Sequence, residues 1–230
     1  MLRTLDISVR YLAQDLVGRG GLATADRLLA SWSRDIVGYG NFELSTQGQD
    51  VFARHAPPFV VMSNHASLLD IPMLLLAVPH TLRMVTKAEL MRIPIWGRAM
   101  RQSGFIPIDR RDRARAIAQL DAAKALLAQG VSVWISPEGT RSRDGALQPF
   151  KKGGFHVAMD LGVPILPAWI EGTYAAMRPD SFLVHQGTPV QVRFGAPIPT
   201  GGPASPDLPT LMASVQDQLI ALRGDAQPSA

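Results

Sequence analysis

A histidine and an aspartate stand five positions apart, directly after a short apolar run. The segment Ser63 to Asp70 contains His65 and ends on Asp70, and it follows the apolar residues Phe59 to Met62. Histidine titrates near neutral pH and can take a proton from an alcohol, while a carboxylate on its other ring nitrogen fixes the tautomer and stabilises the imidazolium. The pair is therefore able to turn a hydroxyl group into a nucleophile.

Two further segments place an arginine after an apolar run. Gly104 to Arg110 ends in a guanidinium, whose planar fork can engage two phosphate oxygens. Ser136 to Ser142 contains Gly139, which lets backbone amides approach an anion closely, and Arg141 follows it. Each segment taken alone is also compatible with a solvated arginine or an ordinary turn.

Short apolar runs alternate with helix-like segments from Phe59 onward, and Arg113 to Gln129 is the clearest helix, ended by Gly130. This alternation predicts an α/β fold, in which sites gather at the carboxyl ends of strands. We expect the three segments to share that edge. The predicted strands are Phe59 to Met62, Leu82 to Thr86, Phe105 to Ile108, Ser132 to Ser136, Val163 to Ile170 and Val190 to Phe194.

Residues 1–40 are predicted to form a pair of amphipathic helices broken by glycines between positions 18 and 21. Two interpretations stay open: the pair packs on the main domain, or it anchors the chain at a membrane interface, where Trp32 and several arginines would suit the headgroup layer. Residues 41–224 are assigned to one catalytic domain and 225–230 to a polar tail. Within the domain, Pro197 to Pro209 is expected to be a linker before a helix over Leu211 to Leu222.

Composition narrows the function classes. The 230 residues are 47% hydrophobic and contain no cysteine, which excludes disulfides, thiolate metal sites and an acyl-cysteine mechanism. The net charge of +4 favours anionic partners. The uncharged stretch Ile71 to Leu82 is much shorter than the roughly 20 residues that span a bilayer, and the charged N-terminus does not resemble a signal peptide. The other histidines lack ligand-like spacing, so no metal is predicted.

Four ordered blocks resemble the lysophospholipid acyltransferase superfamily, in particular the bacterial 1-acyl-glycerol-3-phosphate acyltransferases. The resemblance covers about Phe59 to Ile170. Ser136 departs from the aromatic or large apolar residue that often stands there in the family, and residues 1–40 are shorter than the apolar N-terminal helices of many bacterial members. The blocks are Asn64 to Asp70, Gly104 to Arg110, Pro137 to Ser142 and Val163 to Pro167.

The resemblance implies a fold like that of glycerol-3-phosphate acyltransferase, with a mixed central sheet flanked by helices. It implies transfer of a fatty acyl group from an acyl-CoA or acyl-carrier-protein thioester to lysophosphatidic acid, giving phosphatidic acid without a cofactor. His65 would be the general base, Asp70 its orienting partner, and Pro164 part of the acyl-donor or acyl-chain site. The acceptor's phosphate and glycerol would be bound by Lys87, Arg110, Glu138, Gly139, Thr140 and Arg141.

The expected partners are a lysophospholipid, the acyl donor and an anionic membrane surface, but not nucleic acid. The expected location is the cytoplasm, peripherally associated with the inner face of the cell membrane. One alternative is acylation of another lyso-lipid, such as lyso-ornithine lipid or lysophosphatidylglycerol; retention of both Arg110 and Arg141 favours a phosphate-bearing acceptor. Another is a non-catalytic basic module for anionic lipid or nucleic acid, whose binding would survive loss of His65 and weaken with salt.

Overall fold

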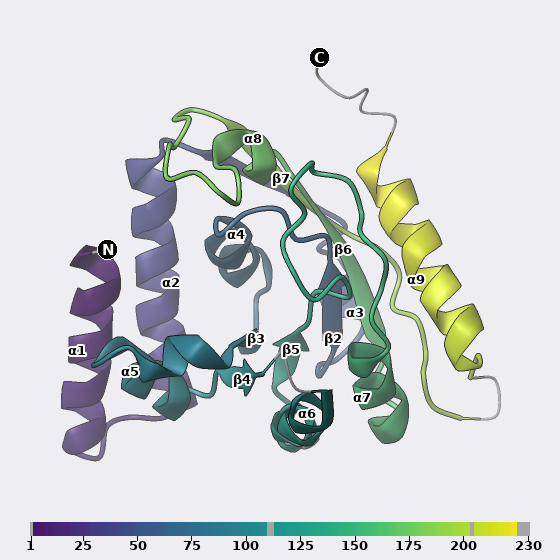
Figure 1. Cartoon of the computed structure of the whole chain (residues 1–230), viewed down its shortest axis with the longest axis horizontal. Helices are drawn as coiled ribbons and strands as arrows, with labels where there is room; N and C mark the ends of the chain where they lie inside the picture. Colours follow the sequence, from purple (N-terminus) through teal and green to yellow (C-terminus); the bar gives the residue numbers. More distant parts are fainter. Residues whose placement is uncertain (1, 110–112, 203–204, 225–230) are drawn as a thin grey trace.

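A seven-stranded sheet forms the centre of the chain. The computed structural model describes residues 2–109, 113–202 and 205–224 (Figure 1). Within these residues the strand order is β1-β7-β6-β2-β5-β3-β4. The strands are β1 (Glu43–Gln47), β2 (Val60–Ser63), β3 (Leu82–Lys87), β4 (Ile106–Ile108), β5 (Ser132–Trp134), β6 (Ile165–Glu171) and β7 (Pro189–Phe194).

The sheet is mixed, as the resemblance implies. Strands β2 to β6 run parallel, so their carboxyl ends meet at one edge. Strand β7 is antiparallel to β6, and β1 pairs with β7 in parallel. Because ligand sites of α/β sheets form where loops leave the carboxyl ends of parallel strands, the edge above β2, β5 and β3 is the place to look for chemistry.

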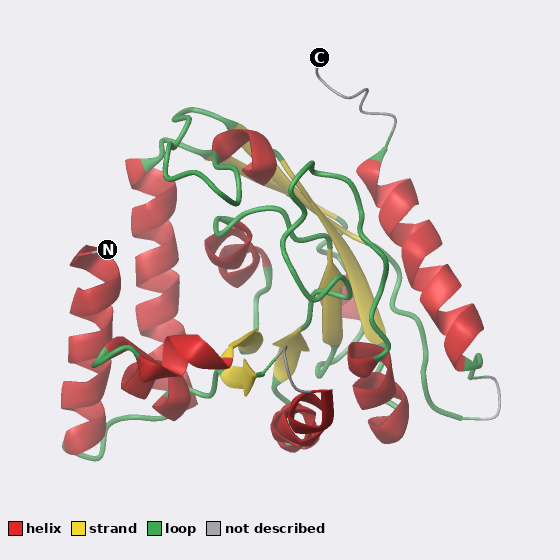
Figure 2. Cartoon of the chain, viewed as in Figure 1, coloured by secondary structure: helices red, strands yellow, loops and turns green. Residues whose placement is uncertain are grey.

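Helices cover both faces of the sheet (Figure 2). One face packs against α4 and α2, with α1 outside α2, and the other packs against α6, α7 and α9. The helices are α1 (Leu2–Leu16), α2 (Leu22–Tyr39), α3 (Val51–Arg54), α4 (Asp70–Ala77), the 3-10 helix η1 (Ala88–Arg92), α5 (Trp96–Gln102), α6 (Arg113–Ala128), α7 (Gly153–Leu161), α8 (Thr173–Ala176) and α9 (Leu208–Arg223).

The alternation of strand side chains explains the two layers. In β2, Val61 points into the core under α4, whereas Val60 and Met62 point into the core under α6 and α7. All three side chains are buried, which is why the central strands are uninterrupted apolar runs in the sequence. Strand β2 is thereby packed on both faces. The loop that carries His65 follows directly after this buried strand.

The N-terminal helices α1 and α2 lie side by side and pack on the domain (Figure 1). Trp32 Nε1 donates to Thr4 Oγ1 at 3.1 Å between them. A buried arginine on β3 fastens α2: the Arg83 guanidinium donates to Asp26 Oδ1 at 2.6 Å and to the carbonyls of Leu22 and Ser103. Among the described residues, no helix is long and apolar enough to cross a membrane.

Most predicted elements are confirmed to within two residues, and three differ. The sequence prediction missed β1, because this edge strand has mostly exposed residues and no apolar run. The expected linker Pro197 to Pro209 is partly packed: Ile198 bridges to Ile165, and Thr200 is buried with its hydroxyl on the carbonyls of α7 and the following turn. Asp70 precedes Ile71 and Pro72, a pattern typical of a helix N-cap, but it is instead the first residue of α4. The tail at 225–230 lies outside the described residues.

Candidate active site

His65 and Asp70 meet at the carboxyl end of β2. His65 lies in the loop between β2 and α4, as its spacing from Asp70 requires, and its Nδ1 is 2.7 Å from Asp70 Oδ2. The His65 side chain is 12% exposed, and its Nε2 has no hydrogen-bond partner in the described part of the chain. With Nδ1–H donated to the carboxylate, Nε2 carries the lone pair of a neutral imidazole and can accept a proton from a substrate hydroxyl.

Asp70 is fixed from several sides. Its side chain is fully buried, and Oδ2 also accepts the backbone N–H groups of Ala66 and Ser67, both at 2.9 Å. These are bonds to the loop before α4, not to the N–H groups inside the helix, which explains why Asp70 does not act as a cap. Oδ1 is buried without a hydrogen-bond partner. The carboxylate therefore directs a single oxygen at His65 and at the backbone that carries it.

The catalytic loop, residues 64–69, is tied to β6 and to the segment after α8. Asn64 pairs with the backbone of Ile170, donating to its carbonyl at 2.9 Å and accepting its N–H at 2.8 Å. Ser67 Oγ donates to the carbonyl of Met177 at 2.7 Å. The Trp134 ring stands edge-on to His65, with 5.1 Å between the ring centroids, and so restricts the imidazole from the β5 side.

The loop after β5 grips the backbone of His65 on both sides. Glu138 Oε1 accepts the His65 N–H at 2.9 Å, and Ser142 N–H donates to the His65 carbonyl at 2.7 Å. Glu138 Oε2 accepts the N–H of Gln148 at 2.8 Å, so both oxygens of this carboxylate bind backbone amides. Glu138 is only 2% exposed. Glu138 therefore positions His65 by binding its backbone N–H group.

Burial changes the ionisation of Glu138. The loss of solvent raises its pKa to about 7, against the two backbone hydrogen bonds from Gln148 and His65, which lower it; the nearby Asp70 and Asp144 raise it further. The carboxyl group is therefore partly protonated near neutral pH, whereas an exposed glutamate would be ionised.

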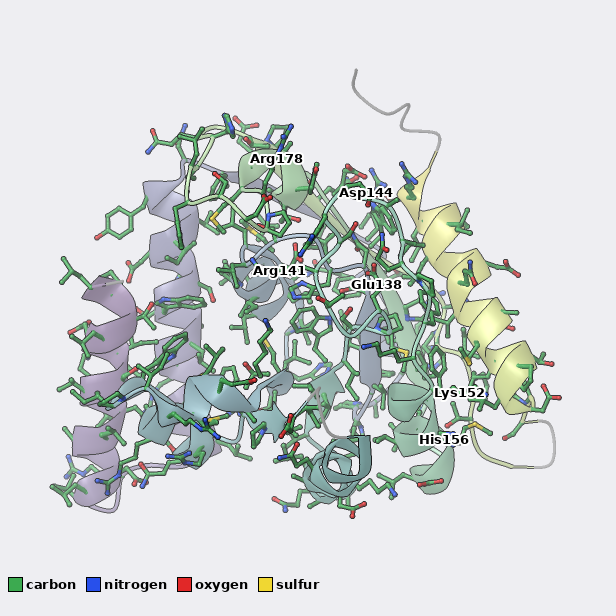
Figure 3. The ribbon with its side chains drawn as sticks, viewed as in Figure 1. Glu138, Arg141, Asp144, Lys152, His156 and Arg178 are labelled. Carbon is green, nitrogen blue, oxygen red and sulfur yellow. The ribbon has the colours of Figure 1, made fainter. Side chains whose placement is uncertain are left out.

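The other residues of the predicted acceptor site that the structure describes lie at the end of β3 and on the segment that follows β5, at the same edge of the sheet as His65. Arg141 is half-buried and forms no ion pair with any described residue, and Lys87 is exposed at the carboxyl end of β3, on the edge where His65 lies. Gly139 adopts φ +69° in a tight turn, and Thr140 beside it is exposed. Arg110, the remaining residue of the predicted acceptor site, lies outside the described residues. Figure 3 shows Arg141 and Glu138 above the sheet, between α4 and α7.

Pro164 is not brought to this edge. It precedes β6, and its carbonyl accepts the N–H of Val60 at 3.0 Å, where β2 begins. Strands β2 and β6 run parallel, so Pro164 lies at the opposite edge of the sheet from His65. Pro164 thus contributes to the pairing of β2 with β6 and lies away from the imidazole of His65.

A cavity of about 520 Å³ lies under the N-terminal helices and reaches the catalytic loop. Leu68 and Ile71, which flank Asp70, form one wall, and residues of α1, α2, η1 and α5 form the others. The lining is almost entirely apolar. Two of its hydroxyls donate to helix carbonyls: Tyr11 to Gln102 O at 2.8 Å and Ser8 to Thr4 O at 2.7 Å. An apolar space of this size suits a hydrocarbon chain.

A sequence model of the family described as Acyltransferase matches residues 43–171, more than half of the chain. The chain belongs to this acyltransferase family. The matched region runs from β1 to the end of β6 and so contains His65, Asp70, Glu138 and Arg141. Membership agrees with the resemblance seen in the sequence blocks and extends it to β1.

The relatives of this acyltransferase are named consistently. Human 1-acyl-sn-glycerol-3-phosphate acyltransferase alpha is 35% identical over 176 residues, which cover 74% of this chain and 61% of the human protein. The chloroplastic 1-acyl-sn-glycerol-3-phosphate acyltransferase BAT2 of Brassica napus is 38% identical over 59% of the chain and 39% of its own length. The chain thus spans about three fifths or less of these relatives.

A solved structure extends the likeness beyond the matched sequence region. The crystal structure of the 1-acyl-sn-glycerophosphate (LPA) acyltransferase PlsC from Thermotoga maritima superposes with a TM-score of 0.72 at 27% sequence identity. The superposition covers 90% of this acyltransferase and 83% of that protein. Because 90% of the chain is more than the matched sequence region, the shared architecture includes elements on both sides of it.

Sequence reasoning on this acyltransferase found the reacting pair but missed its support. Trp134 lies in a predicted strand and Ser67 in the first sequence block, and no pattern in the sequence indicates that both contact and restrain the catalytic loop. Lys151 follows the third block, and its side chain passes within 2.9 Å of where a Cβ on Gly139 would stand. The two consecutive lysines at 151–152 are the feature of the sequence that points to Lys151. No cluster of three or more possible metal ligands occurs among the described residues.

Proposed function

We propose that this chain transfers a fatty acyl group from an acyl-CoA or acyl-carrier-protein thioester to the free hydroxyl of 1-acyl-glycerol-3-phosphate. The product is phosphatidic acid. The observation that carries the proposal is the His65–Asp70 pair, which leaves a lone pair on Nε2 in a loop that also lines an apolar cavity through Leu68. The names of the relatives support the choice of acceptor.

The residues support a direct attack on the thioester. His65 Nε2 takes the proton of the acceptor hydroxyl as its oxygen attacks the thioester carbonyl, and Asp70 stabilises the imidazolium through Nδ1. The tetrahedral intermediate collapses with cleavage of the C–S bond, and the imidazolium returns its proton to the departing thiolate. No acyl-enzyme is required, which agrees with the absence of cysteine from the sequence.

The surroundings fit the two substrates. Arg141 and Lys87 bring positive charge to the edge where His65 lies, and neither forms an ion pair with a described residue, so both can bind the phosphate of the acceptor. The cavity beside Leu68 and Ile71 is suited to the apolar chain of the acyl donor. The enzyme would work at the inner face of the cell membrane as a peripheral protein, without a metal or resident cofactor.

The test is acyl transfer from a mixture of long-chain acyl thioesters to a panel of lyso-lipids, with products identified by mass. His65→Ala should reduce phosphatidic acid formation by a factor on the order of 10² to 10⁴, the range for loss of a general base. His156→Ala is the matched control, because His156 is exposed on α7 and away from the catalytic loop.

The panel also separates the alternatives. Formation of another diacyl lipid, such as a diacyl ornithine lipid or phosphatidylglycerol, would keep the reaction and overturn the acceptor. Binding of anionic lipid that survives His65→Ala, with no histidine-dependent product from any donor and acceptor, would leave only a basic binding module.

A further inference from the structure

The loop between α8 and β7 carries an exposed apolar tip. Phe182 is 91% exposed, Leu183 65% and Val184 40%. The three residues are consecutive, and Phe182 is the most exposed of them. Scattered exposed apolar side chains are ordinary in soluble proteins, but a contiguous group at the end of a projecting loop marks a contact with something apolar.

The loop is closed at its base and fastened to its neighbours. His185 N–H donates to the carbonyl of Ala176 at 2.8 Å across the base, and Gly187 N–H donates to Gly40 O at 2.9 Å. Gln186 Nε2 donates to Tyr39 O at 3.0 Å, which places the loop beside the end of α2, as Figure 1 shows. The tip therefore projects from a fixed support.

The same support reaches the catalytic loop. Met177, one residue past α8, accepts the hydroxyl of Ser67, and the Ser67 N–H holds the Asp70 carboxylate. The chain from Asp70 through Ser67 to the base of the apolar loop is thus joined by direct hydrogen bonds. These bonds fix the position of the loop base relative to the catalytic loop, and therefore relative to His65.

Positive charge flanks the tip. Arg178 lies at the base of the loop with its guanidinium 5.7 Å from the centre of the Tyr174 ring, and Tyr174 donates to the carbonyl of Arg143 on the neighbouring loop. Figure 3 shows Arg178 beside α8, at the top of the molecule in this view. Asp180 is the acidic residue of the loop and is exposed. Exposed Tyr39 adds an amphipathic ring of the kind enriched at membrane interfaces.

We propose that Phe182, Leu183 and Val184 insert into the interface of an anionic lipid bilayer and set the height of the catalytic loop over it. The proposal rests on the proposed function, because a lysophospholipid acceptor is itself held in the membrane. A bilayer fits better than a protein partner, since three side chains offer far less than the roughly 800 Å² per partner of a stable protein interface. A small apolar tip with exposed Arg178 at the base of its loop and exposed Arg143 on the neighbouring loop suits an anionic surface.

A single cysteine can test the insertion, because the chain contains none. Leu183→Cys, labelled with an environment-sensitive fluorophore, should brighten and shift to the blue on mixing with phosphatidylglycerol–phosphatidylcholine vesicles. Lipids with a quencher on the acyl chain should quench it. Ile220→Cys is the matched control: Ile220 is exposed to a similar degree on α9, remote from the loop, and should show neither change.

An unlabelled variant gives the size of the effect. Phe182→Ser with Leu183→Ser should lower partitioning into these vesicles by about tenfold or more, as loss of two apolar side chains from a lipid contact predicts. Transfer to a short-chain, water-soluble acceptor should be unchanged. Vesicle pelleting that occurs while the Leu183→Cys probe stays silent would overturn the insertion, as would a probe response that depends on protein concentration and needs no lipid.

The two proposals fail separately. Vesicle binding is measured without any acyl donor or acceptor, so insertion of the tip by a protein that transfers no acyl group would overturn the proposed function alone. Acyl transfer to soluble substrates by a protein whose tip ignores the bilayer would overturn the insertion alone.

Discussion

The catalytic loop and the apolar cavity beside it are built in opposite ways. Around His65, nearly every polar group has a named partner: backbone amides bind Asp70 and Glu138, and side chains bind the backbone at Asn64 and Ser67. In the cavity the walls are aliphatic and aromatic, and shape is the main constraint. Hydrogen bonds depend on direction and apolar burial does not, so the loop fixes atoms and the cavity fixes volume.

The largest expected effect is at Asp70. In Asp70→Asn, an amide nitrogen at the Oδ1 position would be a buried donor with no acceptor, and at the Oδ2 position it would meet the three groups that now donate there. Either arrangement disturbs the tautomer of His65. We expect kcat to fall by a factor on the order of 10² to 10⁴ with little change in KM, measured by steady-state acyl transfer.

Asp180→Asn provides the control for that variant, because Asp180 is an exposed carboxylate. A kcat within about twofold of wild type for Asp70→Asn would show that the carboxylate has no part in orienting the histidine.

The comparison predicts a large stability effect where a buried charge fastens one wall of the cavity. Arg83 is fully buried and fastens α2, a wall of the cavity, to β3 and to the carbonyl after α5. Arg83→Met would leave Asp26 and these carbonyls without their donor, and should lower the free energy of unfolding by about 3 kcal/mol in urea titration. Exposed Arg92→Met should change it by less than about 0.5 kcal/mol.

Glu138 should couple stability to pH. Its folded pKa is about 7, above the value of 4.5 for an exposed glutamate, so the folded chain binds more protons between these values. The contribution is complete below pH 4.5 and is lost as the pH rises through 7. The wild-type protein should therefore lose stability across this window, by an amount on the order of 2 to 3 kcal/mol.

The matched variant is Glu138→Gln, which has no titrating group and should lack this part of the pH dependence in thermal unfolding. Its amide nitrogen would face a backbone N–H of either His65 or Gln148, so kcat should also fall, by about tenfold. Parallel pH profiles of unfolding for the two proteins would contradict the raised pKa.

The smallest effect is expected in the cavity. Ala99 lies in its wall and is buried, and Ala99→Leu should shorten the space available to an acyl chain. Each methylene that can no longer be buried costs about 0.8 kcal/mol, which is about fourfold in preference per carbon. Competition between acyl thioesters of different lengths measures the shift. An unchanged preference would place the acyl chain elsewhere.

The same contrast explains what the sequence allowed us to predict. The central strands are short apolar runs, so they could be predicted from the local sequence. His65 and Asp70 are five positions apart and can meet only if His65 lies in a loop, so that loop could be predicted as well. The role of Glu138 was not, because its partner His65 is 73 positions away and a glutamate in a turn looks like a ligand. Strand β1 was missed because an exposed edge strand needs no apolar run. The cavity was invisible because its walls come from helices far apart in the chain.

The ties of the catalytic loop also fix when activity can arise during synthesis. Asn64 and Ser67 depend on Ile170 and Met177, which follow them by 106 and 110 positions. A nascent chain that has emerged only through β5 already contains His65 and Asp70, but lacks the strand and the turn that hold their loop. Contacts of such long sequence separation form late in folding. The chain is therefore expected to become competent for acyl transfer only after β6 and α8 have left the ribosome.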